Sequence, residues 1–241
     1  MNNIISALNV FDVGSPKLRF GSNQDGGYVI NQAIADATTR LISLGMGYED
    51  SFERDWLKRG PATLIEAYDG SVVCQALCSE FPEEVSRTIF YVNRHVGYAV
   101  DQIPLNVIVG GKSGALLKVD IEGAEYHIFD NVRLDNVAGL LLEVHDLDMP
   151  HNQEKLISLI QNQFRDLVLF HVHGNSWGHD FTLSAEGQEF PNFPVVLELS
   201  FIHKDLADGS HLDDASYPIP DIDYSNNPSV PDLDLYWINK L

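Results

Sequence analysis

Basic residues are scarce in this sequence of 241 residues. Lysine and arginine together number 15, against 35 aspartates and glutamates, which gives a formal net charge of −20 with histidine neutral. Nucleic-acid binding depends on cationic side chains that neutralise phosphates, and attraction to anionic membranes depends on the same charges. We therefore expect no nucleic-acid partner and no membrane partner. The balance favours a neutral or cationic small ligand, although acidity also serves solubility alone.

Cysteines and long apolar runs are scarce as well. The two cysteines, Cys74 and Cys78, lie four positions apart, a spacing typical of one helix face and not of a disulfide framework or metal knuckle. No charge-free run approaches the ~20 residues that span a bilayer. The N-terminal segment MNNIISALNVFDVG lacks the basic flank and small-residue cleavage site of a signal peptide. These absences predict a cytoplasmic protein with buried, inert thiols.

Short β-rich segments alternate with helical patterns along the chain. The runs LLKV and GLLLEV are almost continuously apolar, as in a parallel sheet that is covered on both faces. The alternation predicts right-handed crossovers and a doubly wound α/β sheet of the Rossmann-like type. Strands are expected at 40–44, 63–67, 88–92, 115–120, 139–144, 167–173 and 195–201. Helices are expected near 51–58, 72–80, 124–129 and 153–164.

The last two expected strands differ from the others. The segment between them, HGNSWGHDFTLSAEGQEFPNF, contains no helical pattern. We therefore expect these two strands to pair as an antiparallel hairpin. The sequence predicts a mostly parallel seven-stranded sheet that ends in this hairpin, with helices on both faces.

One domain spanning residues 1–241 is expected, with a cap or flap at 1–39, a core at 40–202 and a tail at 203–241. In the cap, Asp25-Gly26-Gly27 predicts a turn that leads into a short strand. The tail holds eight acidic residues, two lysines and four prolines. It is expected to lie extended over the domain, with the Tyr236-Trp237-Ile238 segment as its docking point.

A glycine turn follows the first core strand, within SLGMGYEDSFE at 43–53. Such a turn lets a nucleotide lie close to the backbone at Gly45, Met46 and Gly47, although packing alone can also require it. The dinucleotide fingerprint needs a third glycine and an uncrowded helix start, and three carboxylates crowd this one. Carboxylates repel a phosphate but tolerate the ammonium and sulfonium of S-adenosylmethionine. Asp50 and Glu53 also resemble a helix-capping pair.

Candidate nucleoside-binding residues follow the next two strands. An acidic side chain roughly 20 residues past the glycine turn can accept hydrogen bonds from both ribose hydroxyls. Asp69 is our assignment and Glu66 the fallback, while a helix N-cap is the alternative role for Asp69. Asn93 is placed to bond the adenine edge, or it is a plain turn residue.

The fourth core strand runs into the segment KVDIEGAEY. Asp120, Glu122 and Glu125 follow directly on an apolar strand, where ionised groups are costly unless a partner matches them. Such a cluster indicates a ligand, a cation or a helix cap. Lys118, within the strand, is expected to extend to an edge of the sheet.

The segment KVDIEGAEYHIF resembles the K-[IV]-D-[IVC]-E-G-A-E signature of the FkbM-type S-adenosylmethionine-dependent methyltransferases. Other segments fall in the order of that family: RFGSNQDGGYVI at 19–30, SLGMGYEDSFE at 43–53, AYDGS at 67–71, LLLEVH at 140–145 and HVHGNSWG at 171–178. The resemblance implies a class I methyltransferase fold. It also suggests O-methylation of a hydroxyl on a small molecule, sugar or glycan.

The resemblance also implies a set of cofactor contacts. They are a loop at Gly45, Met46 and Gly47, a ribose acid at Asp69, Asp120 beside the methionine part, and Asp25 on a flap near the cofactor. The segment VNRHVGYAVDQIPLN departs from the family, because it does not display the expected adenine-binding residues. Asn93 therefore rests on its position alone.

Methyl transfer to an alcohol also needs a base or a metal to deal with the hydroxyl proton. We hypothesise that His145 is the general base, oriented by Glu143 or Asp146, and that Asn175 positions the acceptor. A loop histidine can instead simply bond to the backbone. In a metal-dependent variant, Asp120, Glu143 and His145, with Asp146, would bind Mg²⁺ or Mn²⁺ and chelate a vicinal diol.

Two other function classes stay open from the sequence. One is a non-catalytic Rossmann domain that binds a nucleoside and acts as an interaction protein. The other is a nicotinamide oxidoreductase, against which the missing third glycine and the acidic helix start both argue.

Overall fold

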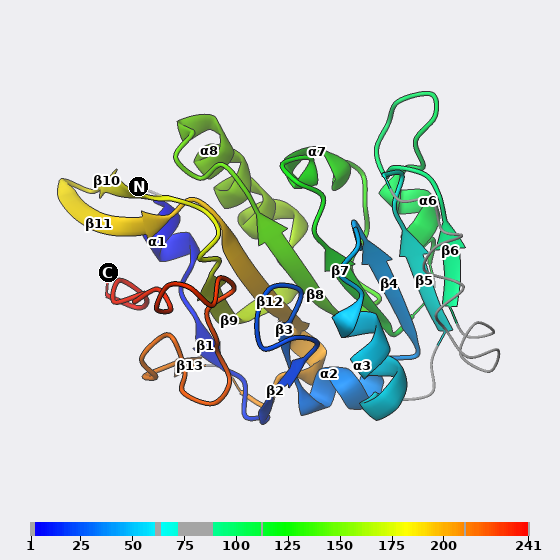
Figure 1. Ribbon diagram of the computed structural model, residues 1–241, viewed down its shortest axis with the longest axis horizontal. Coiled ribbons are helices and arrows are strands. Elements are labelled where there is room, and N and C mark those ends of the chain that lie inside the picture. The colour runs from blue at the N-terminus through cyan, green and yellow to red at the C-terminus, as the bar shows by residue number, and fades with distance from the viewer. Residues whose placement is uncertain (1–2, 61–63, 72–88, 112, 210, 241) are drawn as a thin grey trace.

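A seven-stranded sheet forms the centre of the computed structural model, which describes residues 3–60, 64–71, 89–111, 113–209 and 211–240 (Figure 1). Its strand order is β6-β5-β4-β7-β8-β12-β9. The strands are β4 (Arg40–Leu44), β5 (Leu64–Tyr68), β6 (Ile89–Val92), β7 (Ala115–Val119), β8 (Val137–Val144), β9 (Leu167–Gly174) and β12 (Leu197–His203). Each of them overlaps one predicted strand.

The pairing directions confirm the predicted sheet. β4, β5, β6, β7 and β8 are mutually parallel, and β12 is antiparallel to both β8 and β9. β12 therefore lies between β8 and β9. The last two predicted strands, β9 and β12, form the expected antiparallel pair. This is the Rossmann-like arrangement of a class I methyltransferase fold.

The segment between β9 and β12 contains a hairpin that the sequence analysis missed. β10 (Asp180–Ala185) pairs antiparallel with β11 (Gln188–Pro194) as a separate two-stranded sheet. Glu186 and Gly187 form its turn, both with positive φ. Because most of this ribbon is exposed, it lacks the apolar run that marks the buried strands.

Two apolar layers lie on opposite faces of the sheet, because successive side chains of a strand alternate in direction. One layer joins Ile42 and Leu44 of β4 to helices of one face: α1 (Ile4–Ala7), α6 (Leu105–Val109), α7 (Glu125–Ile128) and α8 (Pro150–Ser158). The other joins Leu41 to α2 (Gln32–Ala37), α3 (Ser51–Arg59) and the hairpin of β2 (Lys17–Phe20) with β3 (Tyr28–Asn31). The prediction of helices on both faces is confirmed.

Helix bounds depart from the prediction in detail. α8 begins at Pro150 and continues into a π-helical turn, Leu159–Gln163, while α6 was not predicted. The helix expected at 72–80, with Cys74 and Cys78, lies outside the described residues. No described helix combines the length and the apolar character that crossing a membrane requires.

The C-terminal tail is tied to the rest of the chain at several points. β13 (His211–Leu212) pairs with β1 (Phe11–Asp12), and a short 3₁₀ helix, Lys204–Leu206, precedes it. Trp237 and Ile238 are buried, and the indole of Trp237 lies 4.7 Å from the ring of Phe193. Tyr236 remains 41% exposed, and its hydroxyl donates to Pro191 O at 3.2 Å.

Candidate functional site

The glycine loop brings two neighbouring strand ends into close contact. Gly45 has φ of +76°, and a Cβ there would lie 1.6 Å from the carbonyl oxygen of Asp120. Its N–H donates to Tyr68 O at 2.9 Å, and the N–H of Asp120 donates to Leu44 O at 3.0 Å. Only glycine permits this approach, which places the backbone of the loop beside Asp120.

Asp69 connects this loop to the turn after β5. Its Oδ2 accepts from Gly47 N at 2.7 Å, and its Oδ1 accepts from both N and Oγ of Ser71 at 2.6 Å. Glu66, the fallback, is instead held by Arg40 through two hydrogen bonds of 2.8 and 2.6 Å.

A cavity of about 270 Å³ opens at the glycine loop. We call it the glycine-loop cavity; its lining includes Gly45, Gly47, Asp69, His95, Asp120 and Glu122. The side chain of Met46 points away and packs against Ala67 and Tyr91, so this residue can contribute only its backbone.

Asn93 lies next to the glycine-loop cavity and not in its lining. It lines an adjoining hollow of about 420 Å³ with Arg94, Asp101 and the shared residues Gly70 and His95. The His95 ring lies against Gly70, where a Cβ would come within 2.4 Å of it. No pattern in the sequence singled out His95.

A second cavity, of about 320 Å³, lies beside the glycine-loop cavity. We call it the carboxylate cavity; its lining includes Asp25, Asp120, Glu122, Glu143, His145, Asn175 and Trp177. Asp120 and Glu122 line both cavities and so mark their boundary. The structure brings the predicted site residues Asp120, His145 and Asn175 together here, and Asp25 lies in the same lining.

Tyr28, which the sequence analysis missed, links the two carboxylates on neighbouring strands. Its hydroxyl lies 2.9 Å from Asp120 Oδ2 and 2.8 Å from Glu143 Oε2. Burial, with the nearby carboxylates, raises the pKa of Tyr28 well above its usual value, so the phenol stays neutral. The single hydroxyl proton can be donated to only one of these carboxyl groups at a time.

The surroundings of Glu143 favour its protonated form. Burial and the charges of Asp120 and Glu198 raise the pKa of Glu143 well above its usual range. Its other oxygen accepts from Asn175 Nδ2 at 3.0 Å. The Asn175 Oδ1 accepts from Trp177 N at 2.9 Å, so Asn175 fixes Glu143 and the turn of Trp177. Asn175 also lines the carboxylate cavity, and its role in positioning the acceptor stays a prediction.

Glu125 orients His145, in place of the predicted Glu143 or Asp146. One oxygen of Glu125 accepts from the backbone N of His145 at 2.7 Å and lies 3.0 Å from its Nδ1. Glu125 is fully buried, and its second oxygen accepts from Gly123 N at 2.8 Å. This arrangement turns Nε2 of His145 toward Glu122 and Glu143, each 3.5 Å away. Sequence spacing does not reveal it, because the contact spans 20 positions.

The acidic surroundings keep a proton on His145. Burial opposes the charge, but the hydrogen bond to Glu125 and the charges of Glu125, Glu143 and Asp120 outweigh it and raise the pKa of His145 to about 9. An imidazolium cannot accept a further proton. His145 can therefore act as a general base near neutral pH only after its proton has been displaced.

The helix start after the glycine loop differs from the predicted capping pair. Asp50 is the N-cap residue of α3 but makes no side-chain cap hydrogen bond and instead accepts from Arg54 Nε at 2.7 Å. Glu53 turns into the core, where it faces Lys118 and accepts from Ser43 Oγ. Lys118 is therefore buried at this pair and does not extend to a sheet edge as predicted.

The C-terminal tail reaches the carboxylate cavity. Asn226, which is buried, donates to Glu198 Oε1 at 2.6 Å and to Asp25 Oδ1 at 3.4 Å. The other oxygen of Glu198 lies 3.0 Å from His173 Nδ1, and His173 Nε2 lies 3.0 Å from Asp232. Tail residues thus form part of the polar network that holds Asp25 in the cavity lining.

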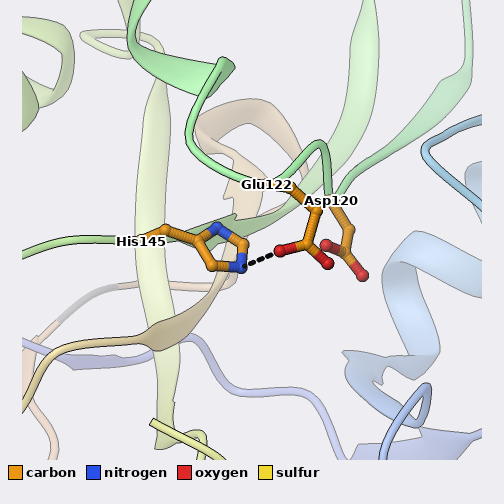
Figure 2. Close-up of side chains that lie close together, drawn as sticks. All are labelled: Asp120, Glu122 and His145. Atoms are coloured by element: carbon orange, nitrogen blue, oxygen red, sulfur yellow. Dashed lines mark ion pairs between the residues drawn. The ribbon is translucent and has the colours of Figure 1, made fainter. Parts of the chain in front are cut away.

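A group suited to a cation lies on the boundary of the two cavities. Asp120, Glu122 and His145 each offer one ligand atom, and these three atoms lie within 4.8 Å of one another (Figure 2). In the predicted metal set, Glu143 held the place of Glu122. The hydrogen bonds that Glu143 makes to Tyr28 and Asn175 leave it less suited than Glu122 to ligate a metal.

No protein-family model and no curated protein matches the chain. Two solved structures to which it is similar are a putative precorrin-6Y C5,15-methyltransferase targeted domain from Corynebacterium diphtheriae and the precorrin-6y C5,15-methyltransferase from Geobacter metallireducens GS-15. The first is 10% identical, with a TM-score of 0.36, over 71% of this chain and 92% of that one. The second is 9% identical, with a TM-score of 0.38, over 70% and 83%. At such identities and TM-scores, function has to be inferred from the residues of this chain.

Proposed function

We propose that this protein is an S-adenosylmethionine-dependent methyltransferase that transfers the methyl group to a hydroxyl of a small molecule, sugar or glycan. The observation that carries the proposal is the boundary between the two cavities, where Asp120 and Glu122 line both. Methyl transfer needs a donor and an acceptor held in contact, and two adjoining cavities with a common wall provide for that.

The glycine-loop cavity fits the cofactor in shape and charge. It lies at the carboxyl ends of β4, β5 and β7, where nucleotides bind in sheets of this kind. Asp69 lines this cavity at the position assigned to the ribose, and His95 and Asn93 lie on the side assigned to adenine. Asp120 and Glu122 face the part assigned to methionine, where carboxylates favour an ammonium and a sulfonium.

The carboxylate cavity restricts the class of acceptor. Its lining holds four carboxyl groups and one histidine, and no lysine or arginine among the described residues contributes to it. An anionic acceptor, such as a phosphosugar or a nucleic acid, would be repelled. Trp177 is 61% exposed and offers an aromatic face on which the C–H groups of a sugar can stack. A neutral polyol, or one that carries an amine, fits this lining best.

Proton balance in the reaction concerns the residues at the boundary. The acceptor oxygen bonds to the methyl carbon, the S–C bond breaks with its electrons left on sulfur, and the hydroxyl proton passes to a base. His145 already carries a proton, so the base is one of the boundary carboxylates unless that proton is displaced. The role of His145 as general base stays a hypothesis, and it requires that the proton on His145 is displaced first.

Cap, core and tail belong together in this proposal. The cap supplies Tyr28 and Asp25 and the tail supplies Asn226, so both contribute to the carboxylate cavity. We therefore treat residues 1–241 as one methyltransferase domain.

Calorimetry with S-adenosylhomocysteine tests the proposed cofactor. We expect micromolar binding that Asp69→Ala weakens by about tenfold or more, equivalent to about 1.4 kcal/mol. Asp36→Asn removes an exposed carboxylate from α2 and serves as the control that should leave affinity unchanged. Absence of binding at millimolar ligand, in a folded sample, would remove the basis of the proposal.

A turnover screen tests the acceptor class. S-adenosylmethionine would be offered with neutral sugars, amino sugars and phosphosugars, and S-adenosylhomocysteine would be measured as product. We expect turnover with the first or second class and none with the third. Cofactor binding without turnover across the panel would favour the non-catalytic nucleoside-binding protein, and quenching or enhancement of NADH fluorescence would favour the oxidoreductase.

A further inference from the structure

We propose that Asp120, Glu122 and His145 bind a divalent transition-metal ion at the boundary of the two cavities. The inference rests on the proposed function, which it deepens by adding a metal-assisted step to methyl transfer. The three side chains come from the loop after β7 and from the end of β8, and they point toward one another (Figure 2).

The spacing of the three ligand atoms fits one ion. All lie within 4.8 Å of one another. Two ligands on one metal can be no farther apart than twice the bond length, which is about 4.2 Å for bonds of 2.1 Å and about 5 Å for bonds of 2.5 Å. Small side-chain rotations therefore bring all three atoms into range, and Glu122, which is exposed, has the freedom to make them.

Glu125 provides a second and independent observation. A metal-bound histidine usually binds through one ring nitrogen while a carboxylate holds the other, which fixes both the tautomer and the ring orientation. Glu125 lies 3.0 Å from His145 Nδ1 and also binds the backbone N–H of His145. Because Glu125 is fully buried and outside the ligand group, it acts as the positioning residue that presents Nε2 to the ion.

The ligand types decide the class of metal. Two carboxylates alone suit Mg²⁺ or Ca²⁺, whereas an imidazole favours a transition metal. A mixed set with open positions suits Mn²⁺ and its neighbours. An ion held by Asp120 and Glu122 would lie next to both cavities, because these two residues line both. An ion here would bind the acceptor hydroxyl and lower its pKa, so that a weak base suffices to remove the proton. Acceptors with two adjacent oxygens would gain most.

Electron paramagnetic resonance with Mn²⁺ as the probe tests the site in the full chain. The signal of free Mn²⁺ falls as the ion binds, which gives both the number of sites and the affinity. We expect one saturable site per chain. Pulsed measurements on the unsubstituted protein should also show coupling to a directly bonded imidazole nitrogen. This readout shows a histidine ligand without any substitution, so it does not depend on a variant that folds.

Substitutions then assign the ligands. Glu122→Gln and His145→Gln should each weaken Mn²⁺ binding by about tenfold or more, and Glu125→Gln by about 10- to 100-fold because the imidazole loses its orientation. Glu189→Gln removes one charge from an exposed residue of β11 and should leave the affinity unchanged. The nitrogen coupling should disappear in His145→Gln and persist in Glu189→Gln.

Mn²⁺ that only screens an acidic surface would bind at several weak sites without nitrogen coupling, or would bind equally well after the ligand substitutions. Either result would overturn the proposal. Calorimetry with S-adenosylhomocysteine on the same samples separates this from failure of the proposed function. Cofactor binding without a Mn²⁺ site rejects the metal alone. Loss of cofactor binding in the unsubstituted protein rejects the methyltransferase itself.

Discussion

Lys118 and Glu53 form a buried ion pair beneath the glycine loop. The ammonium nitrogen lies 3.7 Å from Glu53 Oε1, and the two side chains are 2% and 0% exposed. Burial disfavours the charge on Lys118, but Glu53, Asp120 and Glu143 outweigh it and raise the pKa of Lys118. The pair joins α3 to β7, so it links the helix after the loop to the strand that carries Asp120.

Removal of one partner should destabilise the protein strongly. Lys118→Met leaves the Glu53 carboxylate buried without its cation, and we expect the free energy of unfolding to fall by about 3–5 kcal/mol. Urea denaturation measures this loss. The double variant Lys118→Met/Glu53→Gln keeps an acceptor for Ser43 and removes the orphaned charge, so it should recover a large part of the loss. A loss below about 1 kcal/mol in the single variant would show that the pair is solvated.

The two glycines of the loop should respond differently to alanine. Gly45→Ala places a Cβ 1.6 Å from the carbonyl oxygen of Asp120, so the loop must move and cofactor binding should be lost. Gly47→Ala meets nothing within 4 Å and carries only the strain of φ +58°, about 1–2 kcal/mol. Thermal unfolding and calorimetry with S-adenosylhomocysteine check both. Equal effects would contradict the tight packing of Gly45 on Asp120.

His173 should make stability depend on pH. Burial opposes its charge, but Glu198 and the hydrogen bond to Asp232 outweigh it and raise the pKa of His173 to about 10. The unfolded chain releases this proton near pH 6.5. The stabilisation by His173 is therefore complete below about pH 6.5, declines as pH rises and is lost above about pH 10. The difference in unfolding free energy between the unsubstituted protein and His173→Gln should shrink over this interval.

His171 offers a matched control for that experiment. Burial lowers the pKa of His171 despite its contact with Asp223 at 2.9 Å, so the folded protein holds it neutral. Its stabilising contribution is present above about pH 6.5 and declines as pH falls below that value. The His171→Gln difference should therefore change on the acid side. A common pH profile for the two variants would contradict the assigned charge states.

Asn226 should affect the carboxylate cavity and leave the cofactor site intact. Asn226→Ala removes the donor shared by Glu198 and Asp25, which should lower the unfolding free energy by about 1–3 kcal/mol. Turnover should fall, while affinity for S-adenosylhomocysteine should change by less than about twofold. Asn227→Ala, at a less buried neighbour whose side chain accepts from Ser229 N at 3.0 Å, is the control and should leave turnover and cofactor affinity unchanged. A large loss of cofactor affinity would show that the two cavities are coupled through the tail.

The main sheet could be predicted from local pattern alone. The strands around Leu41, Leu116 and Leu140 are apolar on both faces, and a run of that kind is stable only between two covering layers. The position of Asp120 directly after such a run placed it at the carboxyl edge of the sheet. The exposed hairpin of β10 and β11 carries no comparable signal, and for that reason the sequence did not predict it.

The partners within the site depended on the tertiary structure. Tyr28 meets Glu143 across 115 positions, and His173 meets Asp232 across 59, distances at which a single sequence carries no pairing information. The roles of Glu53, Glu125 and Lys118 changed for the same reason, because burial and an opposing charge decide where a long polar side chain turns. The sequence by itself determined which strands are buried and where acids follow them. Only the folded chain decided which acids are neutral, paired or open to a ligand, because those properties depend on groups that the fold brings together.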